Sequence, residues 1–220
     1  NYHVPLIQDC DVIERPVDQN TLTRRLTEKS VEFIEEHQDR PFFLYLAHPQ
    51  PHIPLFVHPD FLGKSMVSLY GDVIEEIDLS VGTILDTLSE NVLANKTVVV
   101  FSSDNGPWLS FKTHGGSAGP LRAGKGTTFE GGQRVPTIFW GPGIVDTGMV
   151  TEMGSTLDLM KTFAALAGVA PPADRKMDSH DLSPVLKGEG DGPRDEFHYW
   201  TRAELHAIRS GCLLYTSDAA

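Results

Sequence analysis

The sequence predicts an α/β fold, in which helices cover both faces of a mostly parallel β-sheet. Helix-like and strand-like patterns alternate along the chain, and a β-branched apolar run near its middle ends in polar residues. The length of 220 residues, with 40% hydrophobic and 22% charged residues, is typical of a globular protein with one large domain, or one domain and part of another.

The first half of the chain predicts a helix, a strand and a second helix. From about residue 18 to residue 38, apolar residues recur at helical spacing, and Arg40-Pro41 ends that helix. Phe42 to Ala47 predicts a buried strand. The second helix is long and has an apolar face from Leu69 to Leu88. We expect its acidic residues to form a solvated face: Asp72, Glu75, Glu76, Asp86 and Glu90.

The second half predicts two strands and a third helix. Residues 97–103 form an apolar run that ends at Asp104, and residues 135–140 form a shorter run. Ser155 and Asp158 make a capping-box pattern, which predicts the start of the helix, and Gly168 ends it.

The composition changes near residue 186. The glycine-rich stretch 187–193 predicts a linker, and Phe197 to Trp200 and Leu205 to Ile208 predict two short strands. We therefore assign residues 1–186 to the α/β domain, and residues 187–220 to a linker and an incomplete antiparallel subdomain.

Charge and composition exclude several kinds of partner. A net charge of −12 argues against nucleic acid and anionic membranes, since both attract clustered Lys and Arg. No apolar stretch approaches the roughly 20 residues of a transmembrane helix, and no signal peptide opens the chain.

Because the chain begins at Asn1 without a methionine, we expect it to be a fragment. Cys10 and Cys212 lie in no Cys-x-x-Cys pattern and predict free thiols. Nothing in the sequence indicates the oligomeric state.

Asp104 and Asn105 are candidate metal ligands because they follow directly on a predicted strand. Ligands of α/β sheets bind at the carboxyl ends of strands, and hard divalent cations take carboxylate and amide oxygens. The competing interpretation is a turn, since Asp and Asn bond their own backbone and Gly106-Pro107 is turn-like. The tripeptide from Asp104 to Gly106 by itself favours the turn.

Lys125 is a candidate oxyanion ligand on a glycine-rich loop. Gly119 to Lys125 also fits the first positions of a nucleotide-binding P-loop. Gly126 breaks that pattern where a Ser or Thr would hold magnesium, and no strand directly precedes Gly119. We therefore rank the P-loop below a single cation aimed at an oxyanion. A merely solvated lysine is the remaining alternative.

His48 and His52 lie in a proline-rich segment. Their spacing would suit zinc binding from a helix, but prolines at 49, 51 and 54 forbid the helix and predict an extended chain. The segment follows the predicted strand that ends at Ala47, so one histidine is a candidate to face the same crevice as Asp104. There it would protonate a leaving group or bind an anion. The alternative is a loop histidine bonded to backbone carbonyls.

Five ordered motifs resemble the sulfatase pattern. They are Pro51-His52-x-Pro54; Tyr70-Gly71-Asp72 through Glu76-x-Asp78 and Val81-Gly82; Ser103-Asp104-Asn105-Gly106; Gly124-Lys125 with Glu130-Gly131-Gly132-x-Arg134-x-Pro136; and Asp158-Leu159 with Ala167-Gly168. From about residue 5 to residue 211, the chain resembles the second half of an arylsulfatase A-like enzyme of the alkaline phosphatase superfamily.

The resemblance implies roles for four residues. Asp104 and Asn105 correspond to two calcium ligands, and Lys125 corresponds to a lysine that binds the sulfate. His52 corresponds to a histidine that contacts the sulfate ester and assists the leaving oxygen. The implied fold is an alkaline phosphatase-like α/β sandwich with a small antiparallel carboxyl-terminal subdomain. The implied substrate is an aryl or carbohydrate sulfate ester, and the implied location is extracytoplasmic: periplasmic, secreted or lysosomal.

The resemblance also implies a nucleophile that this chain does not contain. Sulfatases use a formylglycine made from the cysteine or serine of a Cys/Ser-x-Pro-x-Arg motif near the amino end, and the 220 residues hold no such motif. We therefore expect the nucleophile in a preceding half of the protein, and the present chain alone to be inactive. After Gly211 the sequence departs from the family pattern, and we expect no function from residues 212–220.

Two other functions stay open at this level. The same scaffold supports phosphodiesterases and phosphonate hydrolases, which the identity of the nucleophile would separate from sulfatases. A non-catalytic relative would only bind sulfated glycans. Asn95-Lys96-Thr97 matches a glycosylation sequon, and we interpret it as a turn before a strand.

Overall fold

The computed structural model describes residues 3–216, and the chain divides into two compact units. The first unit comprises Asn1–Ala94 and Trp108–Ser117, and the second comprises Asn95–Pro107 and Ala118–Ala220. Residues 212–220, where the sequence departs from the family pattern, are described only in part, because residues 217–220 lie outside the described residues. The predicted boundary near residue 186 does not coincide with this division, and the domain limits of the complete protein stay a prediction.

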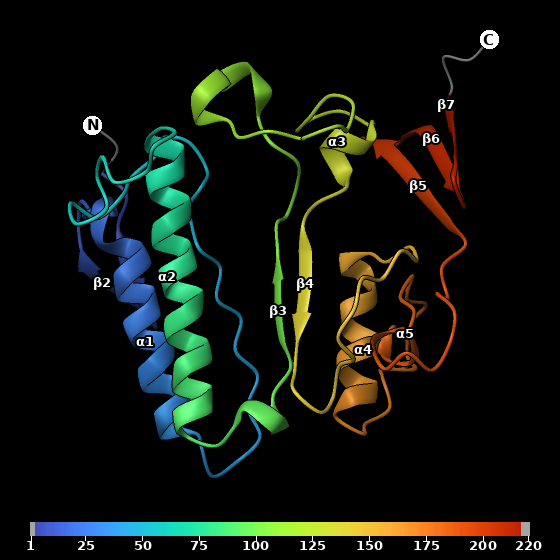
Figure 1. Ribbon diagram of the computed structural model, residues 1–220, viewed down its shortest axis with the longest axis horizontal. Helices are drawn as coiled ribbons and strands as arrows, with labels where there is room; N and C mark the ends of the chain where they lie inside the picture. Colours follow the sequence, from blue (N-terminus) through green and yellow to red (C-terminus); the bar gives the residue numbers. More distant parts are fainter. Residues whose placement is uncertain (1–2, 217–220) are drawn as a thin grey trace. The chain divides into compact units, whose positions relative to one another are not determined.

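Two packed helices form the body of the first unit (Figure 1). Strands β1 (Leu6–Gln8) and β2 (Asp11–Glu14) make an antiparallel hairpin, and η1 (Gln19–Thr21) leads into α1 (Leu22–Glu36). Helix α1 packs against α2 (Leu69–Glu90), and η3 (Leu109–His114) also contacts α2. Both long helices were predicted from their apolar periodicity, and both are confirmed. A core of Val57, Val73 and Ile77 fixes the loop before α2 against that helix.

The prediction that the acids of α2 face solvent is wrong for Asp72 and Glu76, which are both buried. The Asp72 carboxylate accepts hydrogen bonds from the backbone amides of Gly63 (2.8 Å) and Ser65 (2.7 Å). The Glu76 carboxylate accepts one from the His58 amide (3.0 Å). The loop folds over this face of α2, and its partly buried amides find their acceptors there. The Asp72 and Glu76 carboxylates are these acceptors, so the two acids stabilise the loop and do not belong to a solvated face.

The predicted strand from Phe42 to Ala47 is also wrong, because no strand runs there. Side chains alternate between half-buried and exposed, with Phe43 70% and Tyr45 81% exposed. Phe42 packs edge-on against Phe33 of α1, with ring centroids 5.7 Å apart. Alternation of this kind belongs to an extended chain with one covered face. A β-strand also needs a hydrogen-bonded neighbour, and no described strand pairs with this segment.

The second unit contains the strand that leads to Asp104 and Asn105, which we call the strand-end pair. After η2 (Ala94–Lys96), β3 (Val99–Ser102) pairs antiparallel with β4 (Thr137–Trp140), as the register Ser102 opposite Thr137 shows. Both strands were predicted and are confirmed. The pairing is antiparallel because the connection leaves and re-enters at the same end of the ladder, without the crossover that parallel strands need. Every strand pair among the described residues is antiparallel, so the mostly parallel sheet stays a prediction for the complete protein.

Helix α4 (Leu159–Leu166) begins at the predicted capping box. The Ser155 hydroxyl accepts from the Leu157 amide (3.2 Å), and the Asp158 carboxylate accepts from the Ser155 amide (2.8 Å). The short η4 (Thr156–Asp158) therefore opens the helix, and Gly168, with φ +68°, follows its end as expected.

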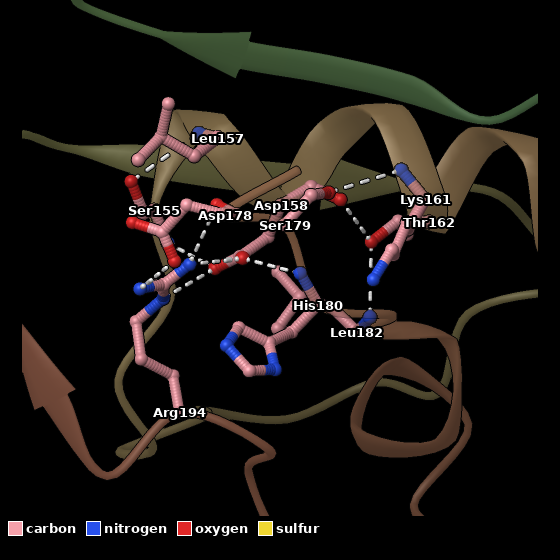
Figure 2. A network of polar contacts seen from close by, with 10 residues as sticks. All are labelled: Ser155, Leu157, Asp158, Lys161, Thr162, Asp178, Ser179, His180, Leu182 and Arg194. Carbon is pink, nitrogen blue, oxygen red and sulfur yellow. Dashed lines mark hydrogen bonds and ion pairs between the residues drawn. The ribbon is translucent and has the colours of Figure 1, made fainter. Parts of the chain in front are cut away.

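Asp158 has a second role that the capping pattern did not reveal (Figure 2). Its carboxylate is 0% exposed and forms two hydrogen bonds with the Arg194 guanidinium, at 2.6 and 3.1 Å. The His180 amide donates to the same carboxylate at 2.8 Å. Thr162 adds a parallel link, because its hydroxyl donates to the Asp158 carbonyl and accepts from the Leu182 amide. These bonds join α4 to the segment that carries α5 (Ser183–Leu186).

The pKa of Asp158 reflects this environment. Burial by itself would raise the pKa, but the Arg194 guanidinium and the backbone amides outweigh it and hold the pKa below its usual value. A carboxyl group with a lowered pKa in the folded state stabilises the fold above its unfolded pKa of about 3.9. That contribution is lost as the pH falls through the folded value.

A three-stranded antiparallel sheet closes the second unit. Strands β5 (Glu196–Thr201), β6 (Glu204–Ser210) and β7 (Leu213–Thr216) lie in that order. The two predicted strands are confirmed as β5 and β6, and β7 was not predicted. In the part of the chain that the structure describes, no helix is both long and apolar enough to span a membrane.

Removal of the Arg194 guanidinium should destabilise the protein strongly. In Arg194→Met, the Asp158 carboxylate would stay buried without its charge partner, and we expect the free energy of unfolding to fall by about 3–5 kcal/mol. Arg175→Met is the matched control, because Arg175 pairs with Asp174 on the exposed surface; its effect should stay within about 0.5 kcal/mol. Urea denaturation of the complete protein measures both. Equal, small effects would show that the buried pair does not stabilise the fold.

Candidate functional site

The strand-end pair leaves β3 in an open loop. Asp104 is exposed, and Asn105 is partly buried. The Asn105 side-chain amide donates to Asp104 Oδ1 (3.0 Å) and to the Gly106 carbonyl (3.4 Å), and the Ser103 hydroxyl donates to the Asn105 carbonyl (2.9 Å). Asn105 thus uses its nitrogen locally, and its amide oxygen is turned to accept from elsewhere or to bind a cation.

Gly106 anchors this loop to a second loop far along the chain. Its amide donates to the Gly132 carbonyl at 3.0 Å, and a Cβ at Gly106 would overlap the carbonyl of Gly131. The chain bends at Asp104 and Asn105 with local side-chain bonds, as the turn interpretation expects, and Gly106 in addition bonds to a remote carbonyl. Because Gly106 has no side chain, its backbone can approach Gly131 and Gly132 this closely.

A second hydrogen bond between the two loops brings the backbone of Lys125 close to the strand-end pair. The Lys125 amide donates to the Pro107 carbonyl at 2.8 Å, three residues beyond Asp104. Inside the lysine loop, the Thr127 hydroxyl donates to the Gly124 carbonyl at 2.7 Å. Arg122 lies over the Phe129 ring, with its guanidinium carbon 3.8 Å from the centroid. The backbone is therefore held at both sides of Lys125, and the second unit brings Asp104, Asn105 and Lys125 together.

The structure does not have the elements of a P-loop. No described strand leads directly into Gly119, because η3 lies between β3 and that glycine, and the next helix is α3 (Glu130–Gln133), which begins five residues after Lys125. Gly126 occupies the position where a hydroxyl would hold magnesium. The lysine therefore lies on a loop and not before a phosphate-binding helix.

His52 belongs to the first unit, so the described geometry does not join it to the other three residues. Its segment contains no helix, as the prolines predicted. The His52 ring is exposed, and its Nδ1 lies 2.6 Å from the Ile53 carbonyl oxygen. A carbonyl oxygen only accepts, so Nδ1 carries the proton and Nε2 of the neutral ring is the acceptor. The ring lies near Trp108, at 6.0 Å between centroids.

His48 is placed differently from His52. Its Nε2 lies 3.2 Å from the hydroxyl of Ser80 on α2, and burial lowers the pKa of the imidazole. Since the Ser80 hydroxyl also contacts Thr27 of α1 at 2.5 Å, His48 joins a polar link between the two helices. The structure therefore favours a packing role for His48 and leaves His52 as the candidate site histidine.

The donor set fits a hard divalent cation in kind but not in number. Asp104 supplies carboxylate oxygens and Asn105 an amide oxygen, which are calcium ligands by chemistry. Calcium takes roughly six to eight oxygens. Within residues 3–216, no group of three or more His, Cys, Asp or Glu side chains is placed to hold a metal ion.

Sequence reasoning missed the residue that supports the lysine loop. Glu130 opens α3, and its carboxylate accepts from the hydroxyl of Tyr199 on β5 and from Arg209 on β6. Its place in the Glu130-Gly131-Gly132 motif was a signal of importance. The partners were not visible, because they lie more than sixty residues away in sequence.

Comparison with known proteins gives one consistent result. The family model described as Sulfatase matches residues 3–169. The chain is 38% identical over 211 residues to steryl-sulfatase of Homo sapiens, covering 93% of this chain and 36% of that protein. It is 41% identical over 210 residues to N-acetylgalactosamine-6-sulfatase of Canis lupus familiaris, covering 90% of this chain and 40% of that protein. The chain thus spans about two fifths of these relatives' length.

The fold gives the same result. A solved structure of a protein from the metabolism of multiple glycosaminoglycans in Bacteroides thetaiotaomicron superposes with a TM-score of 0.83 at 29% identity. The match covers 98% of this chain and 48% of that one. A sulfatase from Pseudoalteromonas sp. superposes with a TM-score of 0.82 at 28% identity, over 90% of this chain and 42% of that one. Phosphonate monoester hydrolases superpose with a TM-score of 0.64 at 17% and 19% identity, which shows a shared fold alone.

Adding one methyl group at Gly106 should disrupt the site. In Gly106→Ala, the new Cβ would collide with the Gly131 backbone, and overpacking of this kind costs about 1–3 kcal/mol. Gly82→Ala is the control, because Gly82 lies within α2 with open space at its Cβ position; alanine there should stabilise the helix by about 0.5–1 kcal/mol. Thermal unfolding of the complete protein measures both changes. A Gly106→Ala variant as stable as the parent would show that the two loops are not in tight contact.

Proposed function

This chain belongs to the sulfatase family, and on that premise we propose that it is the carboxyl-terminal part of a sulfuric ester hydrolase. The observation that carries the proposal is the joining of the two loops, in which Gly106 bonds to Gly132 and Lys125 bonds to Pro107. It supports the proposal because Asp104 and Asn105, which would bind a cation through oxygen, and Lys125, which would bind the sulfate, belong to one compact unit. The relatives at 38% and 41% identity are both sulfatases, which favours a sulfate ester over a phosphodiester or a phosphonate.

Asp104 and Asn105 would hold calcium, together with ligands from the remainder of the protein. A bound divalent cation supplies Lewis-acid stabilisation of negative charge on the sulfate oxygens. The contribution of this chain is to fix the two ligands. The hydrogen bond from Asn105 Nδ2 to Asp104 Oδ1 sets the side chains in one orientation, and the Gly106 anchor holds their backbone.

Lys125 would bind a sulfate oxygen through its ammonium group. Attack on sulfur adds electron density to the sulfate oxygens, while the breaking bond sends its electron pair to the leaving alcohol oxygen. A fixed cation beside the sulfate oxygens stabilises that transition state more than the ground state. The loop is suited to this task because its backbone is bonded at two places. The Lys125 amide donates to the Pro107 carbonyl, and the Gly131 amide of α3 donates to the Arg122 carbonyl within the lysine loop. The lysine loop is thus in place before the substrate binds, so no reorganisation energy is needed during the reaction.

His52 would protonate the leaving alcohol from Nε2. The Ile53 carbonyl fixes the proton of Nδ1, so the ring takes up and releases its second proton at Nε2. This role requires His52 to face the same ester as Lys125 in the complete protein.

The attacking oxygen would come from outside these residues. A formylglycine would supply it, and the 220 residues contain no Cys/Ser-x-Pro-x-Arg motif from which it is made. We therefore propose that the present chain is inactive by itself. We also propose an aryl or carbohydrate sulfate as the substrate and an extracytoplasmic location for the complete protein. The names of the two curated relatives, a steryl-sulfatase and an N-acetylgalactosamine-6-sulfatase, support a sulfated alcohol without selecting one.

Lys125→Ala in the complete enzyme should lower kcat by roughly 10²- to 10³-fold, because one fixed charge that stabilises the transition state is lost. Lys112→Ala is the control, since Lys112 lies outside the motif on η3, and it should leave kcat unchanged. Steady-state hydrolysis of an aryl sulfate measures both. Equal losses in the two variants would count against the role of Lys125.

Calcium should bind through Asp104. We expect Asp104→Asn to weaken calcium affinity of the complete protein at least tenfold, because a carboxylate ligand becomes neutral, and chelation should abolish hydrolysis. Isothermal titration with calcium reads the affinity without relying on activity. Asp174→Asn, on the exposed surface, serves as the control. Unchanged calcium affinity in Asp104→Asn would place the cation elsewhere.

A further inference from the structure

We propose that Glu130, held by Tyr199 and Arg209 of the carboxyl-terminal sheet, is a positioning residue for Lys125. The proposal rests on the sulfate-binding role given above to Lys125. It assigns to the sheet formed by β5 and β6 a task in the reaction: to fix α3, and through α3 the loop that carries the lysine.

Both oxygens of the Glu130 carboxylate are occupied. The Tyr199 hydroxyl donates to Oε1, and Arg209 Nη1 donates to Oε2 at 2.6 Å. Arg134 is a weaker partner at 3.8 Å and is largely exposed. Tyr199 is buried, and burial together with the Glu130 carboxylate raises the pKa of its phenol. Tyr199 therefore remains a protonated donor over the whole range in which enzymes work.

From Glu130 the connection to the site is short and tight. The next residue, Gly131, donates its amide to the Arg122 carbonyl at 2.9 Å, and a Cβ there would overlap the Ala123 carbonyl. Gly132 accepts from the Gly106 amide. With backbones in direct contact, α3 cannot shift without moving either the lysine loop or the strand-end pair.

The charges fit this role better than a role in catalysis. The Glu130 carboxylate is compensated by Arg209 and bonded by Tyr199, so it is neither a free base nor a free metal ligand. Small displacements of a binding group cost roughly 10²-fold in rate. Glu130, at the start of α3, is bonded to two strands of the carboxyl-terminal sheet, and these bonds are well suited to prevent such displacements.

The test is a double-mutant cycle in the complete enzyme, with hydrolysis of an aryl sulfate as the readout. Tyr199→Phe keeps the ring and removes the hydroxyl. We expect it to lower kcat roughly 10- to 100-fold, with KM changed by less than about threefold and the thermal midpoint nearly unchanged. Tyr215→Phe is the matched control, because Tyr215 lies on β7 of the same sheet and is 58% exposed; it should have no effect.

The decisive arm combines Tyr199→Phe with Lys125→Ala. If Tyr199 acts through Lys125, the double variant should be no slower than Lys125→Ala alone. Multiplied losses would overturn the positioning role, since Tyr199 would then act independently of the lysine. A Lys125→Ala variant with full activity would instead overturn the proposed function. If Tyr199→Phe fails to fold, Glu130→Gln, which keeps the shape of the side chain, takes its place in the same cycle.

Discussion

The candidate site depends on one backbone contact, the approach of Gly106 to Gly131 and Gly132. The hydrogen bond from the Gly106 amide to the Gly132 carbonyl connects a strand-end loop to α3, which follows the lysine loop. A side chain at Gly106 would collide with the Gly131 backbone, and side chains at Gly131 and Gly132 would collide with the backbone of the lysine loop. Because the loops meet, a pair of oxygen ligands and a lysine lie in one compact unit, although neither loop has regular secondary structure around these residues.

Two ion pairs hold the elements around this contact. The buried pair of Asp158 and Arg194 joins α4 to the segment before the carboxyl-terminal sheet, and the partly buried pair of Glu130 and Arg209 joins that sheet to α3. Each carboxylate has a guanidinium and further hydrogen-bond donors, so its desolvation is compensated. The carboxyl-terminal sheet and the segment before it are thus connected to α3 and α4 by side-chain bonds as well as by the continuous backbone.

The sequence was informative where the pattern is local. Helical periodicity predicted α1 and α2, and the box of Ser155 and Asp158 predicted the start of α4, because each depends on neighbours within a turn. Prediction failed where the deciding partner is distant. Asp72 and Glu76 are buried because a loop covers them, and residues 42–47 pair with no described strand. Within the candidate site, Asp104, Asn105, His52 and Lys125 were proposed from motifs, and their roles stay predictions. The supporting role of Glu130 was not, since Tyr199 and Arg209 have no local relation to it.

The central claim is that the strand-end pair and Lys125 bind the two charged parts of one sulfate-ester site. A crystal structure of the complete protein with calcium and a bound sulfate ester tests it most directly. The account predicts calcium at about 2.3–2.6 Å from oxygens of Asp104 and Asn105, and Lys125 Nζ at about 2.7–3.2 Å from an oxygen of the same sulfate. Calcium held by other residues, with Lys125 away from the sulfate, would contradict it.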